Sequence, residues 1–175
     1  MKLALKILKY LLGIAVVLLA AGFLLPSTYS AQRSVTINAP AEKVFPLVAK
    51  HKEWKRWSVW NQRDPNMEMT YSGPEMAAGS KWSWKSKPEG NGGMEFSVVE
   101  PNKRVGYILT MEDMTPATSD LKFTPDGAGT KVAWDMNGNA GMNPVFRWFG
   151  LFMDRLIGPD FEAGLKNLKK LAESA

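Results

Sequence analysis

The chain has 175 residues, of which 45% are apolar and 22% charged, a composition that suits a globular domain with an appendage and excludes a disordered or collagen-like protein. It contains no cysteine and one histidine, His51, which excludes disulfide frameworks, iron–sulfur clusters and cysteine-based zinc sites. Its net charge of +5 would suit a nucleic-acid partner only if that charge were spread over one surface.

The positive charge is instead concentrated at the N-terminus. Lys2, Lys6 and Lys9 precede an uninterrupted apolar run over residues 10–25, which Pro26 ends. Without these three lysines, 19 basic residues face 17 acidic ones, and the remaining charge is +2. No basic stripe remains, so we expect no binding of nucleic acid.

The apolar N-terminal segment is long enough to cross a bilayer. As a helix, residues 3–25 measure roughly 35 Å, against about 30 Å for the hydrocarbon core. The alternatives are a cleaved signal peptide and a retained anchor. The small residues suited to cleavage, 20–22, lie inside the apolar run, so we favour a transmembrane anchor over residues 1–26. Lysines before the span and a single Arg33 after it predict the N-terminus inside and the domain outside the cytoplasmic membrane, periplasmic or extracellular.

The rest of the chain is predicted to form a linker, residues 27–33, and one domain, residues 34–175. Alternating apolar residues predict a first strand over residues 32–38. Residues 38–42, Asn-Ala-Pro-Ala-Glu, then indicate the start of a helix, with proline near its first position. Pro46 should kink this helix.

A short helix and a series of strands follow. Trp54, Trp57 and Trp60 are spaced as on one face of a helix or turn. Six segments then alternate between apolar and polar residues, separated by turns rich in glycine, proline and asparagine. They lie at 67–71, 81–85, 94–98, 105–111, 121–123 and 132–136. With the first strand they predict a seven-stranded antiparallel sheet covered on one side.

The C-terminal part is predicted to be helical in two pieces, separated by Gly158 and Pro159. The second piece carries one apolar stripe that includes Phe161 and Leu165. A curved sheet with this long helix across its concave side would enclose a cavity, in an α+β fold. The first piece, Val145–Ile157, is apolar over most of its circumference. It suits a pocket lid or an interfacial helix, but we favour ordinary packing over the sheet.

Several short motifs occur in a fixed order along residues 33–172. They are residues 35–45 (VTINAPAEKVF), 54–60 (WKRWSVW), 64–66 (DPN), 71–74 (YSGP), 79–84 (GSKWSW), 129–134 (GTKVAW) and 150–165 (GLFMDRLIGPDFEAGL). Together they resemble the START-like or SRPBCC superfamily, in its polyketide cyclase/dehydrase-like branch. The resemblance implies a helix-grip fold around a hydrophobic pocket, and a protein that binds lipids, sterols, polyketides or other apolar molecules. Some members are cyclases, but no catalytic residue transfers to a position here, since fold does not determine function.

Seven tryptophans and ten methionines are the most unusual feature of the composition. Aromatic walls and pliable methionines suit a pocket for a large apolar ligand, although the same residues also suit a small domain's core. The candidate pocket residues are those expected on the inner face of the sheet and on the C-terminal helix: Tyr71, Trp82, Trp84, Phe96, Tyr107, Trp134, Phe161 and Leu165.

Catalytic groups are few. Tyr71 and Tyr107 share the apolar side of their strands and are the acid–base candidates, although a packed ring is the commoner role. His51 lies between two lysines in an apparent surface turn, so we expect it to be exposed. Glu95, Glu112 and Asp135 are predicted to face solvent. No metal-ligand cluster or dinucleotide motif occurs, so we expect neither metal nor cofactor.

These observations predict a membrane-anchored binding module that holds a hydrophobic small molecule or lipid between sheet and C-terminal helix. The alternative is a cyclase or dehydratase that acts on a polyketide-like substrate. A third class, a scaffold that docks another protein, would need a large exposed apolar patch, for which Val145–Ile157 is the candidate.

Overall fold

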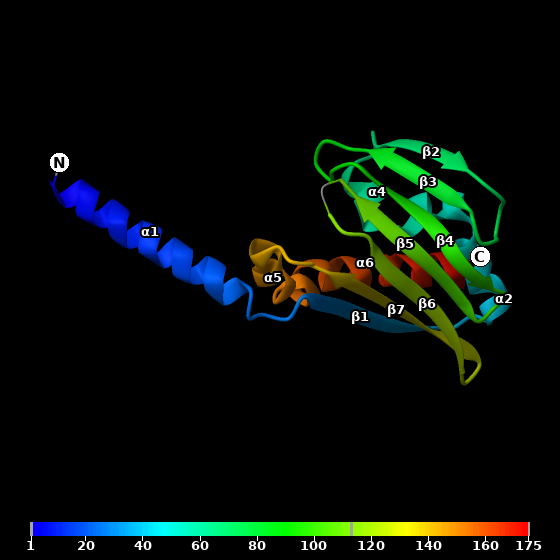
Figure 1. The fold of residues 1–175 in the computed structure, drawn as a ribbon. Helices are drawn as coiled ribbons and strands as arrows, with labels where there is room; N and C mark the ends of the chain where they lie inside the picture. Colours follow the sequence, from blue (N-terminus) through cyan, green and yellow to red (C-terminus); the bar gives the residue numbers. More distant parts are fainter. Residues whose placement is uncertain (1, 113, 175) are drawn as a thin grey trace.

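The computed structural model describes residues 2–112 and 114–174; residues 1 and 175, the outer limits of the predicted anchor and domain, lie outside this range, as does residue 113. Helix α1 (Lys2–Gly22) extends away from a single domain (Figure 1). Its segment Leu3–Gly22 is long and apolar enough to cross a membrane, a property that anchors and signal sequences share.

The domain is built on a seven-stranded antiparallel sheet in the order β1-β7-β6-β5-β4-β3-β2. The strands are β1 (Thr28–Ile37), β2 (Glu68–Ser72), β3 (Lys81–Lys85), β4 (Gly92–Glu100), β5 (Arg104–Met111), β6 (Ala117–Asp126) and β7 (Gly129–Asn139). The last six form a meander, and β1 pairs with β7 at the edge of the sheet. The predicted α+β fold with seven strands is confirmed.

Strand β1 begins earlier than the sequence pattern indicates. Most of the segment expected as a linker, residues 27–33, belongs to this strand, where Thr28 pairs with Asn139 and Arg33 with Trp134. Its polar residues mask the alternation, but Ala31 is buried and faces the core. Only residues 23–27 therefore connect α1 to the sheet.

Four short helical segments follow β1 in close succession. They are α2 (Ala41–Ala49), the 3-10 turn η1 (His51–Glu53), α3 (Trp54–Trp57) and α4 (Val59–Arg63). As expected, α2 begins directly after Pro40 and contains Pro46. Trp54 and Trp57 lie on α3 and are buried, whereas Trp60 lies on α4.

The predicted helix break at Gly158 and Pro159 is wrong. Helix α5 (Pro144–Gly150) ends earlier, and α6 (Met153–Glu173) continues through both residues. Arg33 of β1 packs against the helix at this point, and its guanidinium occupies the space that a side chain at Gly158 would need, so glycine is required there for packing and not as a helix end. Arg33 also donates hydrogen bonds to Asp154 at 2.7 Å and Glu162 at 2.8 Å, on either side of the proline.

The prediction that the segment Val145–Ile157 packs over the sheet is wrong for helix α5. None of its residues is buried, and it contacts α1 and β1 at the end of the domain. The physical reason is competition for one surface: α6 already covers the concave face, where Phe161, Leu165 and Leu168 are at most 2% exposed.

Gly164 allows α6 to approach the sheet closely. A Cβ atom there would lie 3.2 Å from the ring of Trp134 and 3.7 Å from that of Trp57. We therefore expect Gly164→Leu to lower the free energy of unfolding, because overpacking typically costs about 1–3 kcal/mol and the gain in helix propensity is only about 1 kcal/mol. Urea unfolding of the full chain in detergent micelles measures the effect. Exposed Lys166→Leu is the control, and an equal stability of both variants would contradict this packing.

Candidate functional site

An aromatic cluster fills one half of the space between the sheet and α6. The rings of Trp134 and Phe161 stack with centroids 4.1 Å apart and an interplanar angle of 3°. Trp54, Trp57 and Trp60 meet Trp134 edge to face at 5.5–6.0 Å. Such arrangements are favoured by the quadrupoles of the rings. Within this cluster, Trp134 and Trp57 are completely buried.

Hydrogen bonds hold the buried rings in place. The Trp134 indole donates to the hydroxyls of Tyr107 at 3.0 Å and Ser119 at 3.1 Å. Trp54 and Trp57 donate to the carbonyls of Val48 and Leu47, at 2.7 and 2.9 Å. Burial raises the pKa of Tyr107, so its hydroxyl stays protonated and neutral.

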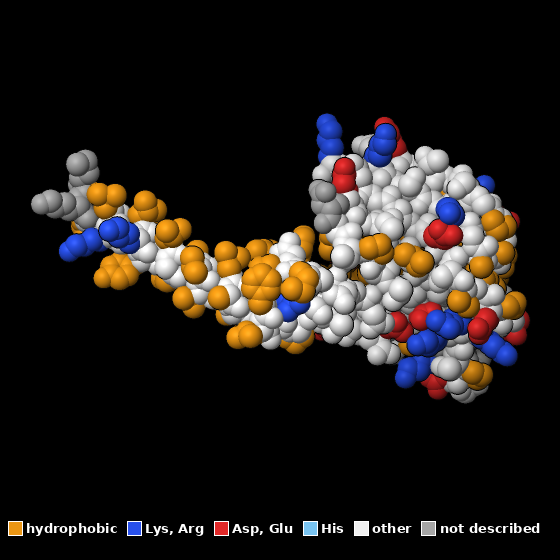
Figure 2. Space-filling view, viewed as in Figure 1, with side chains coloured by type: hydrophobic (Ala, Val, Ile, Leu, Met, Phe, Trp, Pro, Cys, Tyr) orange, Lys and Arg blue, Asp and Glu red, His pale blue; other side chains and the backbone are white. Residues whose placement is uncertain are grey.

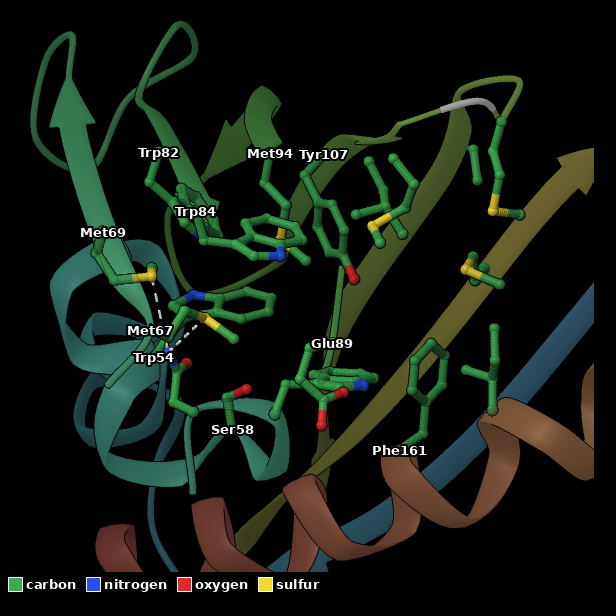
Figure 3. Close-up of a pocket in the computed structure, with 18 of the residues that line it drawn as sticks. Trp54, Ser58, Met67, Met69, Trp82, Trp84, Glu89, Met94, Tyr107 and Phe161 are labelled. Atoms are coloured by element: carbon green, nitrogen blue, oxygen red, sulfur yellow. Dashed lines mark hydrogen bonds between the residues drawn. The ribbon is translucent and has the colours of Figure 1, made fainter. Parts of the chain in front are cut away.

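The other half of the space is hollow. A cavity of about 250 Å³ lies between α4, α6 and the inner face of the sheet (Figure 3). Its lining is almost entirely apolar: Tyr29, Trp54, Trp60, Met67, Met69, Trp82, Trp84, Met94, Tyr107, Leu109, Met111, Met114, Ala117, Met136, Met153, Ile157 and Phe161. The polar members are Ser58, Asn61, Glu89 and Thr115.

Methionine is the commonest residue of the described lining: seven of the ten methionines in the chain line the cavity. The unbranched thioether side chain is flexible and polarizable, so it adapts to apolar molecules of different shapes. The cavity wall therefore combines rigid aromatic rings with deformable methionine side chains.

Four of the eight residues predicted for the pocket contribute to this lining: Trp82, Trp84, Tyr107 and Phe161. The other four lie outside it. Trp134 and Phe96 are completely buried in the aromatic cluster, and Leu165 is covered one turn beyond Phe161. Tyr71 stacks on His51, with ring centroids 5.0 Å apart, and its buried hydroxyl has no hydrogen-bond partner among the described residues.

The prediction of pocket residues missed the methionines, Trp54 and Trp60. A signal for part of this set was present, because Met67 and Met69, like Met94 and Met136, alternate with polar residues and so face the same side as the predicted aromatics. Which inward residues border a void depends on how α3 and α4 cover the sheet, and strand alternation does not contain that information.

Carboxylates at the cavity and on the other side of the sheet form ion pairs with basic residues. Within the described lining, Glu89 is the one carboxylate, and it accepts a hydrogen bond from Arg63 at 2.8 Å. Arg63 also binds Asp160 of α6 at 2.8 Å, so it joins the β3–β4 loop to that helix. On the other side of the sheet, Glu95 pairs with Lys81 at 3.0 Å and Asp135 with Lys122 at 3.2 Å.

Glu112 lies outside the cavity. It is exposed, as expected, and accepts a hydrogen bond from Asn91 at 2.9 Å.

The expectation that His51 is exposed is wrong. The turn η1 directs it inward, where it is 4% exposed between the rings of Tyr71 and Trp82. Its Nδ1 lies 2.5 Å from the hydroxyl of Ser80. Burial, and secondarily the charge of Lys52, lower the pKa of His51 below its ordinary value of 6.5.

The lowered pKa of His51 gives stability a definite pH dependence. The unfolded chain binds a proton at a higher pH than the folded chain, so stability is complete above about pH 6.5 and decreases as the pH falls below it. We expect the free energy of unfolding to decrease between about pH 8 and pH 5, a window above the ordinary carboxylate pKa values of about 4. Urea titrations should show a weaker decrease for His51→Gln; identical decreases would contradict this assignment.

The cavity opens at the end of the sheet from which α1 emerges. Its exposed lining residues, Met114 and Thr115, belong to the β5–β6 loop. The hydroxyl of Thr115 donates to the carbonyl of Asn139, the last residue of β7. The next amide, that of Ala140, donates to Ser27, just before β1, at 2.7 Å. The mouth and the junction with α1 therefore lie together.

The family model described as "Polyketide cyclase / dehydrase and lipid transport" matches residues 28–173. The chain belongs to this family. The resemblance inferred from the sequence motifs is thereby confirmed. A comparison with curated proteins finds no significant match.

Solved structures confirm the fold at low sequence identity. The protein TTHA0849 from Thermus thermophilus is 17% identical, with a TM-score of 0.63, covering 83% of this chain and 97% of its own. Ara h 8.0201 is 10% identical, with a TM-score of 0.60, covering 85% and 99%. The di-domain ARO/CYC protein BexL of the BE-7585A biosynthetic pathway is 19% identical, with a TM-score of 0.60, covering 84% of this chain and 50% of its own.

Proposed function

We propose that this protein is a membrane-anchored module that binds a hydrophobic small molecule or lipid in the pocket between the sheet and α6. The observation that carries the proposal is a cavity of about 250 Å³ whose wall is aromatic and methionine-rich, with its one described carboxylate neutralised by Arg63. Such walls bind apolar molecules, since a polar ligand would lose its hydration without gaining partners.

The energetics of the void support an apolar occupant. At roughly 24 cal/mol per Å³, a fully enclosed apolar void of this volume would destabilise the fold by about 6 kcal/mol, which is an upper limit for this cavity because it is open at one end. The whole stability of a domain is only about 5–15 kcal/mol. An apolar molecule that fills the cavity offsets this cost and replaces the missing contacts. The volume lies just below the range of about 300–1,000 Å³ typical of drug-sized ligands, so a small molecule or one lipid chain suits it.

Contacts between α1 and the domain support a retained anchor over a cleaved signal peptide. Trp148 of α5 donates to the carbonyl of Leu18 at 2.9 Å, and Arg147 donates to that of Phe23 at 2.7 Å. Cleavage after the small residues 20–22 would remove the first of these acceptors. Lys6 and Lys9 near the start of the span then favour a cytoplasmic N-terminus, with the domain periplasmic or extracellular.

An enzyme of the cyclase or dehydratase type is the second candidate, favoured by the Tyr107 hydroxyl at the pocket wall (Figure 3). Its raised pKa suits a hydrogen-bond donor rather than a base. A polyketide-like substrate whose turnover is lost in Tyr107→Phe, with ligand affinity retained, would favour this candidate. Binding without turnover favours the binding module.

Filling the cavity should abolish binding. Leu109 and Ile108 are neighbours on β5, but Leu109 lines the cavity whereas Ile108 is 38% exposed on the opposite face. We expect Leu109→Trp to weaken binding of the fluorescent apolar probe N-phenylnaphthylamine about tenfold or more, or about 1.4 kcal/mol of binding free energy. Fluorescence titration of the full chain in nanodiscs, corrected for probe in the lipid, measures the affinity. Ile108→Trp is the matched control, and equal affinities in both variants would contradict binding in this pocket.

Retention of the anchor has its own test. We expect a chain tagged at both termini to remain in the membrane fraction after an alkaline wash, with both tags on one polypeptide, because α1 is not removed. Protease added outside the cytoplasmic membrane should remove the C-terminal tag only. A soluble fragment that carries the C-terminal tag alone would identify α1 as a signal sequence.

A further inference from the structure

An exposed apolar surface lies where the domain meets α1. We define it as the end surface, formed by residues of α5, of the turn that follows it and of the first turn of α6: Val145, Phe146, Phe149, Phe152 and Leu156, which are 37–57% exposed. Apolar side chains continue from α1 onto the adjoining end of the domain, with a basic side chain visible among them at the junction (Figure 2). Contiguous exposed aromatics of this kind mark an interaction site.

The end surface is held against the last turns of α1. Besides the bond from Trp148 to Leu18, Arg147 reaches the carbonyls of both Phe23 and Leu25, at 2.7 and 3.2 Å. A Cβ atom on Gly22 would lie 2.7 Å from the carbonyl oxygen of Pro144, so only glycine allows this approach. The position of α5 relative to the N-terminal helix is therefore fixed by specific contacts.

If α1 spans a bilayer, the contacts between α5 and α1 determine how deep α5 lies in that bilayer. Leu18 lies four residues before Gly22, the last residue of the helix. At about 1.5 Å per residue, the contact between Trp148 of α5 and Leu18 therefore lies about 6 Å along the helix axis from the end of α1. Interfacial helices bury their apolar faces about 5–10 Å into the boundary between headgroups and acyl chains. Trp148 then lies at the level where membrane proteins concentrate tryptophan.

The open end of the cavity lies beside the same surface. Tyr29 lines the cavity, and a Cβ atom on Gly150 of α5 would be 3.7 Å from its side chain. Met153 and Ile157, each next in the chain to a residue of the end surface, also line the cavity. The route from the cavity to the outside therefore passes next to α5.

We propose that the end surface inserts into the interfacial layer of the membrane that α1 spans, so that the cavity opens toward the acyl chains. The inference rests on the proposed membrane anchoring and adds the partner of α5, the lipid bilayer. An apolar ligand would then exchange between bilayer and cavity without crossing water. Val145, Phe149 and Leu156 contact lipid in this arrangement, which accounts for an apolar helix that the domain leaves uncovered.

Depth-dependent fluorescence quenching tests the insertion directly. The chain contains no cysteine, so single cysteines can carry an environment-sensitive fluorophore. The full chain is reconstituted in vesicles of phosphatidylcholine and phosphatidylglycerol, with nitroxide lipids labelled high or low in the acyl chain. We expect Phe149→Cys to lose most of its fluorescence to the shallow nitroxide, and Leu12→Cys to be quenched more by the deep one. Exposed Lys131→Cys, at the opposite end of β7, should not be quenched by either.

The outcomes separate the two proposals. An unquenched Phe149→Cys beside a quenched Leu12→Cys overturns the insertion and leaves the anchor intact. If neither variant is quenched, the anchoring is overturned and, with it, this inference. Leu156→Cys repeats the measurement at a second exposed position, in case the first label disturbs α5.

The rate of ligand transfer tests the orientation of the cavity. A double variant, Phe149→Glu and Phe152→Glu, should slow the uptake of a fluorescent fatty acid from these vesicles several-fold, while its affinity at equilibrium stays that of the native chain. Ile108→Glu, on the outer face of the sheet, is the matched control and should leave the rate unchanged. A double variant that takes up the fatty acid at the native rate overturns the opening toward the bilayer.

Discussion

The stack of Trp134 on Phe161 determines how α6 lies on the sheet. Trp134 stands on β7, next to the edge strand, and its indole is held by Ser119 of the neighbouring strand β6 and by Tyr107 of β5, one strand further on. The ring of Phe161, on α6, lies parallel to that of Trp134, and Gly164, about one turn later, allows the helix to approach the same ring closely. Three further tryptophans close around the pair, so one half of the enclosed volume is filled by rigid rings.

The hollow half follows from the same arrangement. Because α6 is held at the β1–β7 edge by Trp134 and Arg33, it cannot also approach β2 and β3 at the other edge. The space that remains is bordered by α4 and by inward residues of the central strands. Methionines there are flexible enough to surround an occupant, whereas the rings beyond them are not. Arg63 joins the β3–β4 loop to α6 across this space, which keeps the two walls at a fixed separation.

The position of α6 also explains why α5 is not covered by the rest of the domain. With the concave face occupied, the apolar segment before α6 has no sheet to cover and instead meets α1 through Arg147 and Trp148. Helix α1, the end surface and the mouth of the cavity thus gather at one end of the molecule. If α1 spans a bilayer, as we propose, only residues 23–27 separate that span from the sheet.

Much of this fold was predictable from the sequence, because strand alternation and turn residues are local signals. The seven strands, the entry into α2 at Pro40 and the tryptophan helices all follow from such signals. The errors concern long-range contacts. Pro159 does not break α6, since Arg33, more than a hundred residues away, bridges both sides of it. His51 is buried because of Tyr71 and Trp82, which strand pairing brings beside it.

In the candidate site, too, local sequence patterns were predictive and long-range packing was not. Alternation identified which residues point inward, including Trp82, Trp84 and Tyr107. It did not separate residues that fill the core, such as Phe96, from residues that border the void, such as Met94. That difference depends on where α3, α4 and α6 rest on the sheet.

The central claim is that the methionine-lined cavity holds an apolar molecule. Native mass spectrometry of the full chain, released from mild detergent, measures this most directly. We expect the native chain to carry additional mass from an apolar molecule, and a Leu109→Trp chain to carry none. The bare mass of the polypeptide in both would contradict that claim.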